Sequence, residues 1–199
     1  MDLGAITAHD AVDADSDLRP AAVIVPVVER PNGPHVLFTK RAEHLEDHPG
    51  QMSFPGGGYE PEDDDLRATA RREADEEIGL DPAEPSFHGR LDDFETVTHY
   101  VIRPFVATVP DRPYEPGDDE VAEIAVLALA DILDPDNYET EMREHPSYGR
   151  VRLHYFHVDG YTVWGATAAM LVQFLELATD WESPPDPEQV LDHDADSLP

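Results

Sequence analysis

Apolar residues gather in several short runs along the chain, and each run predicts a β-strand. Residues 21–28, AAVIVPVV, are apolar on both faces, which is typical of a buried strand, and Pro26 within them marks an edge or a bulge. Asn32 and Gly33 predict a tight turn, so residues 35–40 are expected to pair with the first strand as a hairpin. Further strands are predicted at residues 87–93, 100–109, 124–129 and 151–158.

Other stretches have a helical pattern. Residues 66–78 contain no proline or glycine, the side chains of residues 63–65 are available as N-caps, and Gly79 is free to end the helix. Residues 165–181 place apolar side chains on one face, as a helix packed on a core does. A short helix is expected at residues 130–133.

The length of 199 residues suits one domain with a sizeable core. We expect residues 1–19 to form an N-terminal arm, either a short capping helix or a loose segment, and residues 20–181 to form the domain. Residues 182–199 are rich in proline and acidic side chains, which predicts a disordered tail.

The charge is the most unusual feature of the composition. The chain has 44 acidic and 13 basic residues, a formal net charge of −31, and Lys40 is its single lysine. Such a charge repels nucleic acid and anionic membranes, so neither is expected as a partner. It resembles the surface of a protein from a salt-loving organism, where molar salt shortens the Debye length to about 3 Å.

Several classes of site and location are excluded by what the sequence lacks. There is no cysteine, so disulfides and thiolate metal sites are absent. His154 and His157 fall on opposite faces of a predicted strand, which disfavours a histidine metal pair. The first residues do not resemble a signal peptide, and no apolar run approaches the roughly 20 residues of a membrane span. A cytoplasmic protein is expected.

The predicted helix at residues 66–78 places three carboxylates close together. Glu73 and Glu77 lie one turn apart, with Glu76 beside them, on the flank of an apolar stripe. One interpretation is a solvated acidic face, which is common in an acidic chain. However, the two glutamates repel each other near the negative end of the helix dipole, so a cation would stabilise them. Oxygen ligands of this kind favour Mg²⁺ or Mn²⁺.

The same stretch resembles the Nudix box, in which Gly, five residues, Glu and seven residues precede Arg-Glu-aliphatic-x-Glu-Glu-x-Gly-aliphatic. Here Gly58 is followed after five residues by Asp64 and after seven more by residues 72–80, READEEIGL. Asp64 replaces the usual glutamate and Ala74 replaces a bulkier aliphatic residue. The resemblance implies an α/β protein with the Nudix fold, a mixed β-sheet sandwiched between helices, and a metal-dependent hydrolase.

The resemblance also implies roles for individual residues. The metal ligands would be the three box glutamates and a glycine carbonyl, namely Glu73, Glu76, Glu77 and Gly57 or Gly58. The general base would be Glu73, Glu76 or Glu120, and Glu120 is alternatively a further metal ligand or a solvated loop acid. Arg72 would pair with a box carboxylate and orient it.

Two flanking segments resemble signatures of the coenzyme A pyrophosphatase subgroup. The first comprises residues 37–42, LFTKRA, with Gly50 and residues 54–57, FPGG, at the matching spacing, and the second is residues 164–168, WGATA. Glu46 departs from the signature, because the subgroup has arginine there. The implied substrate is coenzyme A or an acyl derivative, cut at its pyrophosphate.

Substrate contacts would come from arginines that reverse the local charge and from the loop before the box. The expected substrate-binding residues are Arg41, Phe54, Gly56, Gly57 and Arg103. Two alternatives stay open, namely another nucleoside diphosphate derivative such as ADP-ribose, NADH or a dinucleoside polyphosphate, and a noncatalytic domain that senses a nucleotide. The assembly is also open, with a homodimer as one option.

Overall fold

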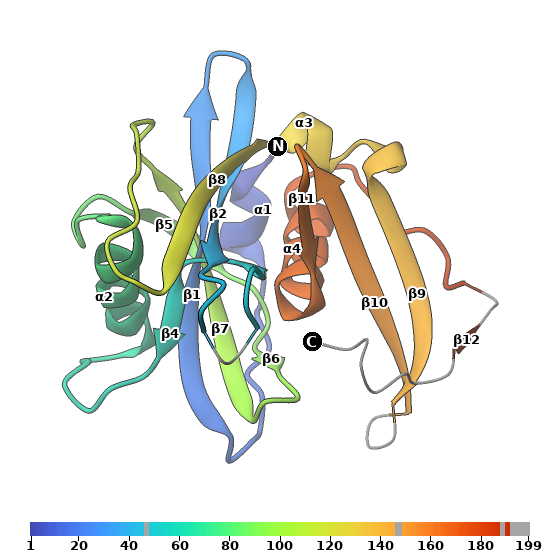
Figure 1. The fold of residues 1–199 in the computed structure, drawn as a ribbon, viewed down its shortest axis with the longest axis horizontal. Coiled ribbons are helices and arrows are strands. Elements are labelled where there is room, and N and C mark those ends of the chain that lie inside the picture. The colour runs from blue at the N-terminus through green and yellow to red at the C-terminus, as the bar shows by residue number, and fades with distance from the viewer. Residues whose placement is uncertain (46–47, 146–148, 188–189, 192–199) are drawn as a thin grey trace.

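The computed structural model describes residues 1–45, 48–145, 149–187 and 190–191, and its strands form two sheets (Figure 1). The larger sheet has eight strands: β1 (Arg19–Arg30), β2 (Gly33–Arg41), β3 (Met52–Ser53), β4 (Gly56–Gly58), β5 (Ser86–Arg90), β6 (Phe94–Glu95), β7 (Tyr100–Val109) and β8 (Val121–Ala128). β1 and β7 are parallel, and the other pairs are antiparallel, so the sheet is mixed as expected.

β1 pairs with two different strands along its length, and this arrangement positions β4. β1 pairs with β2 at residues 27–30 but with β4 at residues 21–23. β3 pairs with residues 39–40 near the end of β2, so the short segment from β3 to β4 lies between β2 and β1. The sheet therefore places the glycines of β4 in its interior, next to β1.

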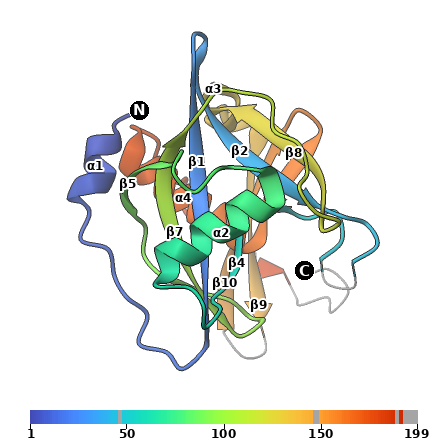
Figure 2. The same ribbon diagram turned by 90° about the vertical axis from the view of Figure 1, so that its left-hand side faces the viewer.

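One face of this sheet is covered by α2 (Leu66–Ile78), which crosses it in Figure 2. Asp65 caps the helix by accepting the Ala68 N–H at 2.8 Å, and Gly79 ends it in the left-handed conformation at φ 63°. The expected helix is thus confirmed at both ends. Ala74 is fully buried in the apolar cluster between α2 and the sheet.

The opposite face packs against α1 (Leu3–Ala8), α4 (Gly165–Ala178) and a second sheet. That sheet consists of β11 (Tyr161–Trp164), β10 (Gly149–Val158), β9 (Tyr138–His145) and β12 (Val190–Leu191), in this order. α3 (Leu129–Ile132) and the 3₁₀ turn η1 (Pro135–Asn137) connect the two sheets. The Nudix expectation of a sheet between helices holds for the larger sheet, whereas the second sheet was not predicted as a separate unit.

Both ends of the chain contact the domain where the structure describes them. The arm begins with α1, whose Ile6 is 1% exposed, so it is a capping helix rather than a loose segment. Residues 182–187 lie near β10, because Arg152 donates to the Pro184 carbonyl at 2.6 Å and to Asp186 at 2.9 Å. β12 adds to β9. Disorder at residues 188–189 and 192–199 stays a prediction, because they lie outside the described residues.

Candidate active site

α2 turns two of its box carboxylates onto the glycine strand β4. Glu77 is 8% exposed, and its Oε2 accepts the Gly56 N–H at 3.1 Å. The Glu73 carboxylate lies over Gly57, where an added Cβ would be 2.6 Å from its Oε1. Glu76 lies toward solvent. Glycine at position 57 is therefore a steric requirement of the site.

Arg72 links these carboxylates to one another. Its Nη1 donates to Glu73 Oε1 at 3.0 Å and to Glu76 Oε2 at 3.2 Å, and its Nη2 donates to the Gly58 carbonyl at 3.1 Å. The expected pairing of Arg72 with a box carboxylate is present. Because one guanidinium reaches both glutamates and β4, it fixes the helix relative to the strand.

Asp63, which the spacing of the motif did not single out, contacts Arg72 directly. It accepts from Nε and Nη2 of Arg72, both at 3.1 Å, and from the Thr69 hydroxyl at 2.8 Å, whereas Asp64 is exposed. The Arg72 guanidinium lowers the pKa of Asp63 to about 2. The acid that binds Arg72 is therefore Asp63, one residue before Asp64, which occupies the motif position. The only sequence signal for it is the run of three aspartates at residues 63–65.

Burial raises the pKa of two glutamates in the site, Glu73 and Glu77. It raises the pKa of Glu77 to about 8, against the Gly56 N–H that favours the carboxylate, and the nearby charges of Glu73 and Asp118 raise it further. Burial also raises the pKa of Glu73. Both carboxylates are costly to keep ionised without a cation.

The donor set fits a hard divalent cation, as the sequence predicted. Carboxylate oxygens on one helix face, beside a glycine strand, are the oxygen ligands that Mg²⁺ and Mn²⁺ take. Among the described residues, no three acidic or histidine side chains already converge as a finished metal site. The Arg72 guanidinium is bonded to Oε1 of Glu73 and to Oε2 of Glu76, so it would compete with a cation for these two oxygens.

The loop before β8 closes one side of the site. Gly117 donates to the Glu77 carbonyl at 2.9 Å, and an added Cβ at Gly117 would lie 2.1 Å from the Glu76 carbonyl. This contact brings Asp118 close enough to influence Glu77 electrostatically. Asp118 also accepts the N–H groups of Glu120 and Val121, at 2.9 and 3.2 Å.

Glu120 lies at the rim of the site beside Arg41. Its Oε2 is 3.8 Å from Arg41 Nη1, its carbonyl accepts the Ala42 N–H at 2.7 Å, and its side chain is 60% exposed. The charge of Arg41 lowers the pKa of Glu77, so Arg41 belongs to the site's surroundings. The role of Glu120 as a ligand or base stays a prediction.

The structure shows what surrounds the side chains of two predicted substrate-binding residues, Phe54 and Arg103. Phe54 is 2% exposed and stacks on Phe38 with ring centroids 5.1 Å apart, so its side chain belongs to the core. Arg103 donates to both oxygens of Asp93, at 2.8 and 2.7 Å, and to Asp13 at 2.6 Å. These bonds tie the N-terminal arm to β7 through the Arg103 guanidinium.

The segment that contains α2 and β4 lies within a stretch that matches a known family. Residues 18–147 match the model of the NUDIX domain. The chain belongs to the Nudix family. It is a Nudix hydrolase, and enzymes of this family generally need divalent metal ions.

Similar Nudix proteins come from enteric bacteria. "Uncharacterized Nudix hydrolase NudL" of Cronobacter sakazakii is 39% identical over 155 residues, which cover 77% of this chain and 79% of that protein. The protein of the same name from Escherichia fergusonii is 37% identical over the same shares of both chains.

Solved Nudix structures are more distant in sequence. The hydrolase RenU of M. smegmatis has a TM-score of 0.49 at 19% identity, covering 58% of this chain and 74% of that one. The NUDIX domain of Shewanella oneidensis NrtR, solved with ADP ribose, has a TM-score of 0.49 at 18% identity, covering 59% and 77%. Among the described residues of this chain, no helix is long and apolar enough to cross a membrane.

Proposed function

We propose that this Nudix hydrolase cleaves the pyrophosphate bond of coenzyme A or acyl-coenzyme A, with Mg²⁺ or Mn²⁺. The products are 3′,5′-ADP and 4′-phosphopantetheine or its acyl form. The observation that carries the diphosphate chemistry is the seating of Glu73 and Glu77 on the glycines of β4. A cation would stabilise the two buried carboxylates. It would also reduce the repulsion between a diphosphate and a chain of net charge −31.

The coenzyme A assignment rests on the two flanking segments, residues 37–57 and 164–168. Much of the first segment supports the box directly, because Phe54 anchors it in the core and Gly56 and Gly57 meet the box carboxylates. Arg41, also in this segment, supplies a positive group beside the site that suits a substrate phosphate. The same segment therefore supplies the glycines that contact the carboxylates of α2 and an arginine that suits a substrate phosphate.

The reaction adds water across one phosphoric anhydride bond. The water oxygen bonds to one phosphorus, the bond from that phosphorus to the bridging oxygen breaks, and the other phosphate leaves with that oxygen. A bound divalent ion would be held by Glu73, Glu76, Glu77 and the carbonyl of Gly57, and it would neutralise charge on the phosphates. Glu73, Glu76 and Glu120 are the candidates that accept the proton of the water.

Arg72 and Asp63 act on this chemistry through position. Asp63 holds the Nε and Nη2 edge of the Arg72 guanidinium, and Nη1 of the same guanidinium orients Glu73 and Glu76. Coordinated carboxylates in so small a space titrate together, so a pH profile would report the group rather than one glutamate.

A second candidate is hydrolysis of another nucleoside diphosphate derivative, such as ADP-ribose, NADH or a dinucleoside polyphosphate. The observation that favours it is Glu46, which stands where the coenzyme A subgroup has arginine and removes one positive contact. Glu46 itself lies outside the described residues.

A substrate panel tests both candidates. Coenzyme A, acetyl-coenzyme A, ADP-ribose, NADH and diadenosine tetraphosphate would be incubated with Mg²⁺ or Mn²⁺ in molar KCl, and the products separated by anion exchange. Dominant release of 3′,5′-ADP from coenzyme A supports the proposal. Preference for another member of the panel overturns the coenzyme A assignment and leaves the diphosphatase, and silence on all five with Glu77 intact overturns both.

A further inference from the structure

The segment between β7 and β8 that comprises residues 110–118 has no helix or strand of its own, and it runs past the carboxyl end of α2 (Figure 2). We call it the docking segment. Without a ladder of backbone hydrogen bonds, such a segment keeps one shape only through contacts that offset its conformational entropy. Three of its residues make contacts of this kind, and all of them meet α2 or the residue that ends it, namely Arg112, Tyr114 and Gly117.

Arg112 binds the end of the helix. Its Nη2 donates to the Gly79 carbonyl at 2.6 Å and to Glu84 at 2.9 Å, and its guanidinium lies 4.4 Å from the centroid of the Tyr114 ring. α2 has no basic residue in its own last turn, although a positive group there would stabilise the negative end of the helix dipole. Arg112 supplies that positive group from a distant part of the chain.

Tyr114 and Gly117 hold the docking segment against the helix itself. The Tyr114 ring packs on the apolar cluster between α2 and the sheet, and its hydroxyl donates to the Pro110 carbonyl at 2.7 Å. The Gly117 N–H donates to the Glu77 carbonyl at 2.9 Å, and an added Cβ at Gly117 would collide with the Glu76 carbonyl oxygen. Glycine at this position therefore lets the segment lie directly on the last turn of α2.

We propose that Arg112 and Gly117 are positioning residues for the metal-binding end of α2. Glu76 and Glu77 lie in the turn that the docking segment contacts, so the segment fixes the two side chains that would share an ion. The same contact keeps Asp118 near Glu77. This inference rests on the metal-dependent chemistry of the proposed function and does not depend on the coenzyme A assignment.

Mn²⁺ binding tests the proposal without any substrate. Equilibrium dialysis of the full chain, with free Mn²⁺ measured by electron paramagnetic resonance, gives the affinity, and circular dichroism verifies that each variant folds. Gly117→Ala adds the Cβ that the Glu76 carbonyl excludes and changes no charge. We expect this variant to bind Mn²⁺ at least tenfold more weakly than the unchanged protein.

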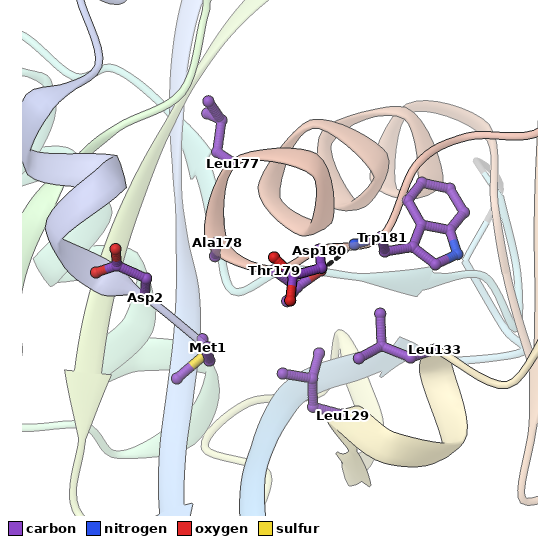
Figure 3. A pocket seen from close by; sticks show the side chains of 9 residues that line it. All are labelled: Met1, Asp2, Leu129, Leu133, Leu177, Ala178, Thr179, Asp180 and Trp181. Atoms are coloured by element: carbon purple, nitrogen blue, oxygen red, sulfur yellow. Dashed lines mark hydrogen bonds between the residues drawn. The ribbon is translucent and has the colours of Figure 1, made fainter.

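Gly89→Ala is the matched control, because it also forces a Cβ against a helix carbonyl. That Cβ would lie 2.7 Å from the carbonyl oxygen of Ile6 in α1, the helix whose N-cap Asp2 lines the pocket shown in Figure 3. None of the described residues that line this pocket belongs to α2 or to the docking segment. Gly89→Ala should therefore lower the melting temperature and leave the Mn²⁺ affinity within twofold.

Arg112→Gln separates position from charge. Loss of a positive charge near the box would by itself tighten the binding of a cation, so weaker binding in a folded Arg112→Gln protein reports lost position. We expect at least threefold weaker binding. Arg112→Lys should recover part of the affinity, because lysine keeps the charge and a donor for the Gly79 carbonyl.

Unchanged Mn²⁺ affinity in Gly117→Ala, an equal loss in Gly89→Ala, or tighter binding in Arg112→Gln overturns the proposal. If Gly117→Ala does not fold, the two Arg112 variants decide it. Failure of the unchanged protein to bind Mn²⁺ overturns the metal site and this inference with it. A substrate panel without turnover, together with normal Mn²⁺ binding, overturns the proposed substrates alone.

Discussion

Asp63 accepts two hydrogen bonds from one edge of the Arg72 guanidinium, from Nε to Oδ1 and from Nη2 to Oδ2, each at 3.1 Å. Asp63 precedes α2 and Arg72 lies within it, so the pair ties the incoming loop to the second turn of the helix. A bidentate pair fixes direction as well as distance. The orientation of Glu73 and Glu76 therefore depends on a residue that has no direct contact with either glutamate among the bonds described.

Asp63→Asn should weaken both folding and catalysis. The change removes the buried carboxylate that accepts from Nε and Nη2 of Arg72, while Glu73 and Glu76 remain, and we expect a loss of about 2 kcal/mol in the free energy of unfolding. It should lower kcat more than it raises KM, because the carboxylates lose their orientation. Urea denaturation and steady-state kinetics measure the two effects.

Asp64→Asn is the matched control, because Asp64 is exposed and adjacent in sequence. Its stability and kcat should stay near those of the unchanged protein. If Asp64→Asn were the more damaging variant, the assignment of the anchoring acid to Asp63 would be wrong.

Glu77→Gln should abolish turnover and leave the fold intact. The amide oxygen can still accept the Gly56 N–H, and loss of a buried charge removes a desolvation cost, so metal-free stability should not fall. Turnover should fall by several powers of ten, because a metal ligand is lost. Exposed Glu62→Gln serves as the control, and near-normal turnover in Glu77→Gln would remove the metal assignment.

Gly57→Ala and Gly58→Ala form a pair that tests the site's shape. A Cβ at Gly57 would meet the Glu73 carboxylate at 2.6 Å, whereas a Cβ at Gly58 would have no atom within 4 Å. We expect Gly57→Ala to lower kcat at least 100-fold, on the order of 3 kcal/mol in the activation barrier, and Gly58→Ala to change it little. Equal activity in both variants would show that Glu73 moves freely above the strand.

His154 should make the second sheet sensitive to acid. Burial lowers the pKa of His154 to about 4, and its Nδ1 lies 2.7 Å from the Tyr138 hydroxyl. The folded state thus prefers neutral imidazole. The corresponding stability is present above the ordinary pKa of about 6.5 and is lost as the pH falls from there toward 4.

We expect the free energy of unfolding of His154→Gln to fall by about 2 kcal/mol less than that of the unchanged protein on acidification, because glutamine does not titrate. The measurement is the difference between the two proteins in free energy of unfolding at pH 7 and pH 4.5. His157→Gln, at the exposed histidine of the same strand, is the control. Parallel pH curves for His154→Gln and the unchanged protein would contradict the burial effect.

The parts of the molecule that the sequence predicted well depend on local chemistry. α2 was recognisable because Asp65 and Gly79 mark its ends and its apolar stripe repeats every fourth residue. The glutamates on it were recognisable because helix geometry alone places them together.

The surroundings of Phe54 and Arg103 depend on contacts between distant segments. Whether Phe54 faces a substrate or Phe38 is decided by how β3 packs, and Arg103 meets Asp13 only because the arm returns to β7. β9, YETEMREH, lacks an apolar run, so its pairing with β10 left no clear local signal. A sequence pattern reports what a residue type can do, and the tertiary fold selects its partner.

The net charge of −31 predicts that salt stabilises the folded protein. Carboxylates spread over one small domain repel each other more when folded than when extended, and raising KCl from 0.1 to 1 M shortens the Debye length from about 10 to about 3 Å. We expect Tm to rise by about 4 to 8 °C over this range, which corresponds to about 2 kcal/mol for a chain of this size. Differential scanning calorimetry in KCl measures it, with sucrose at equal osmolality as the control for solvent exclusion. If Tm were already maximal in dilute buffer, charge repulsion would not limit stability, and the resemblance to proteins of salt-loving organisms would be one of composition alone.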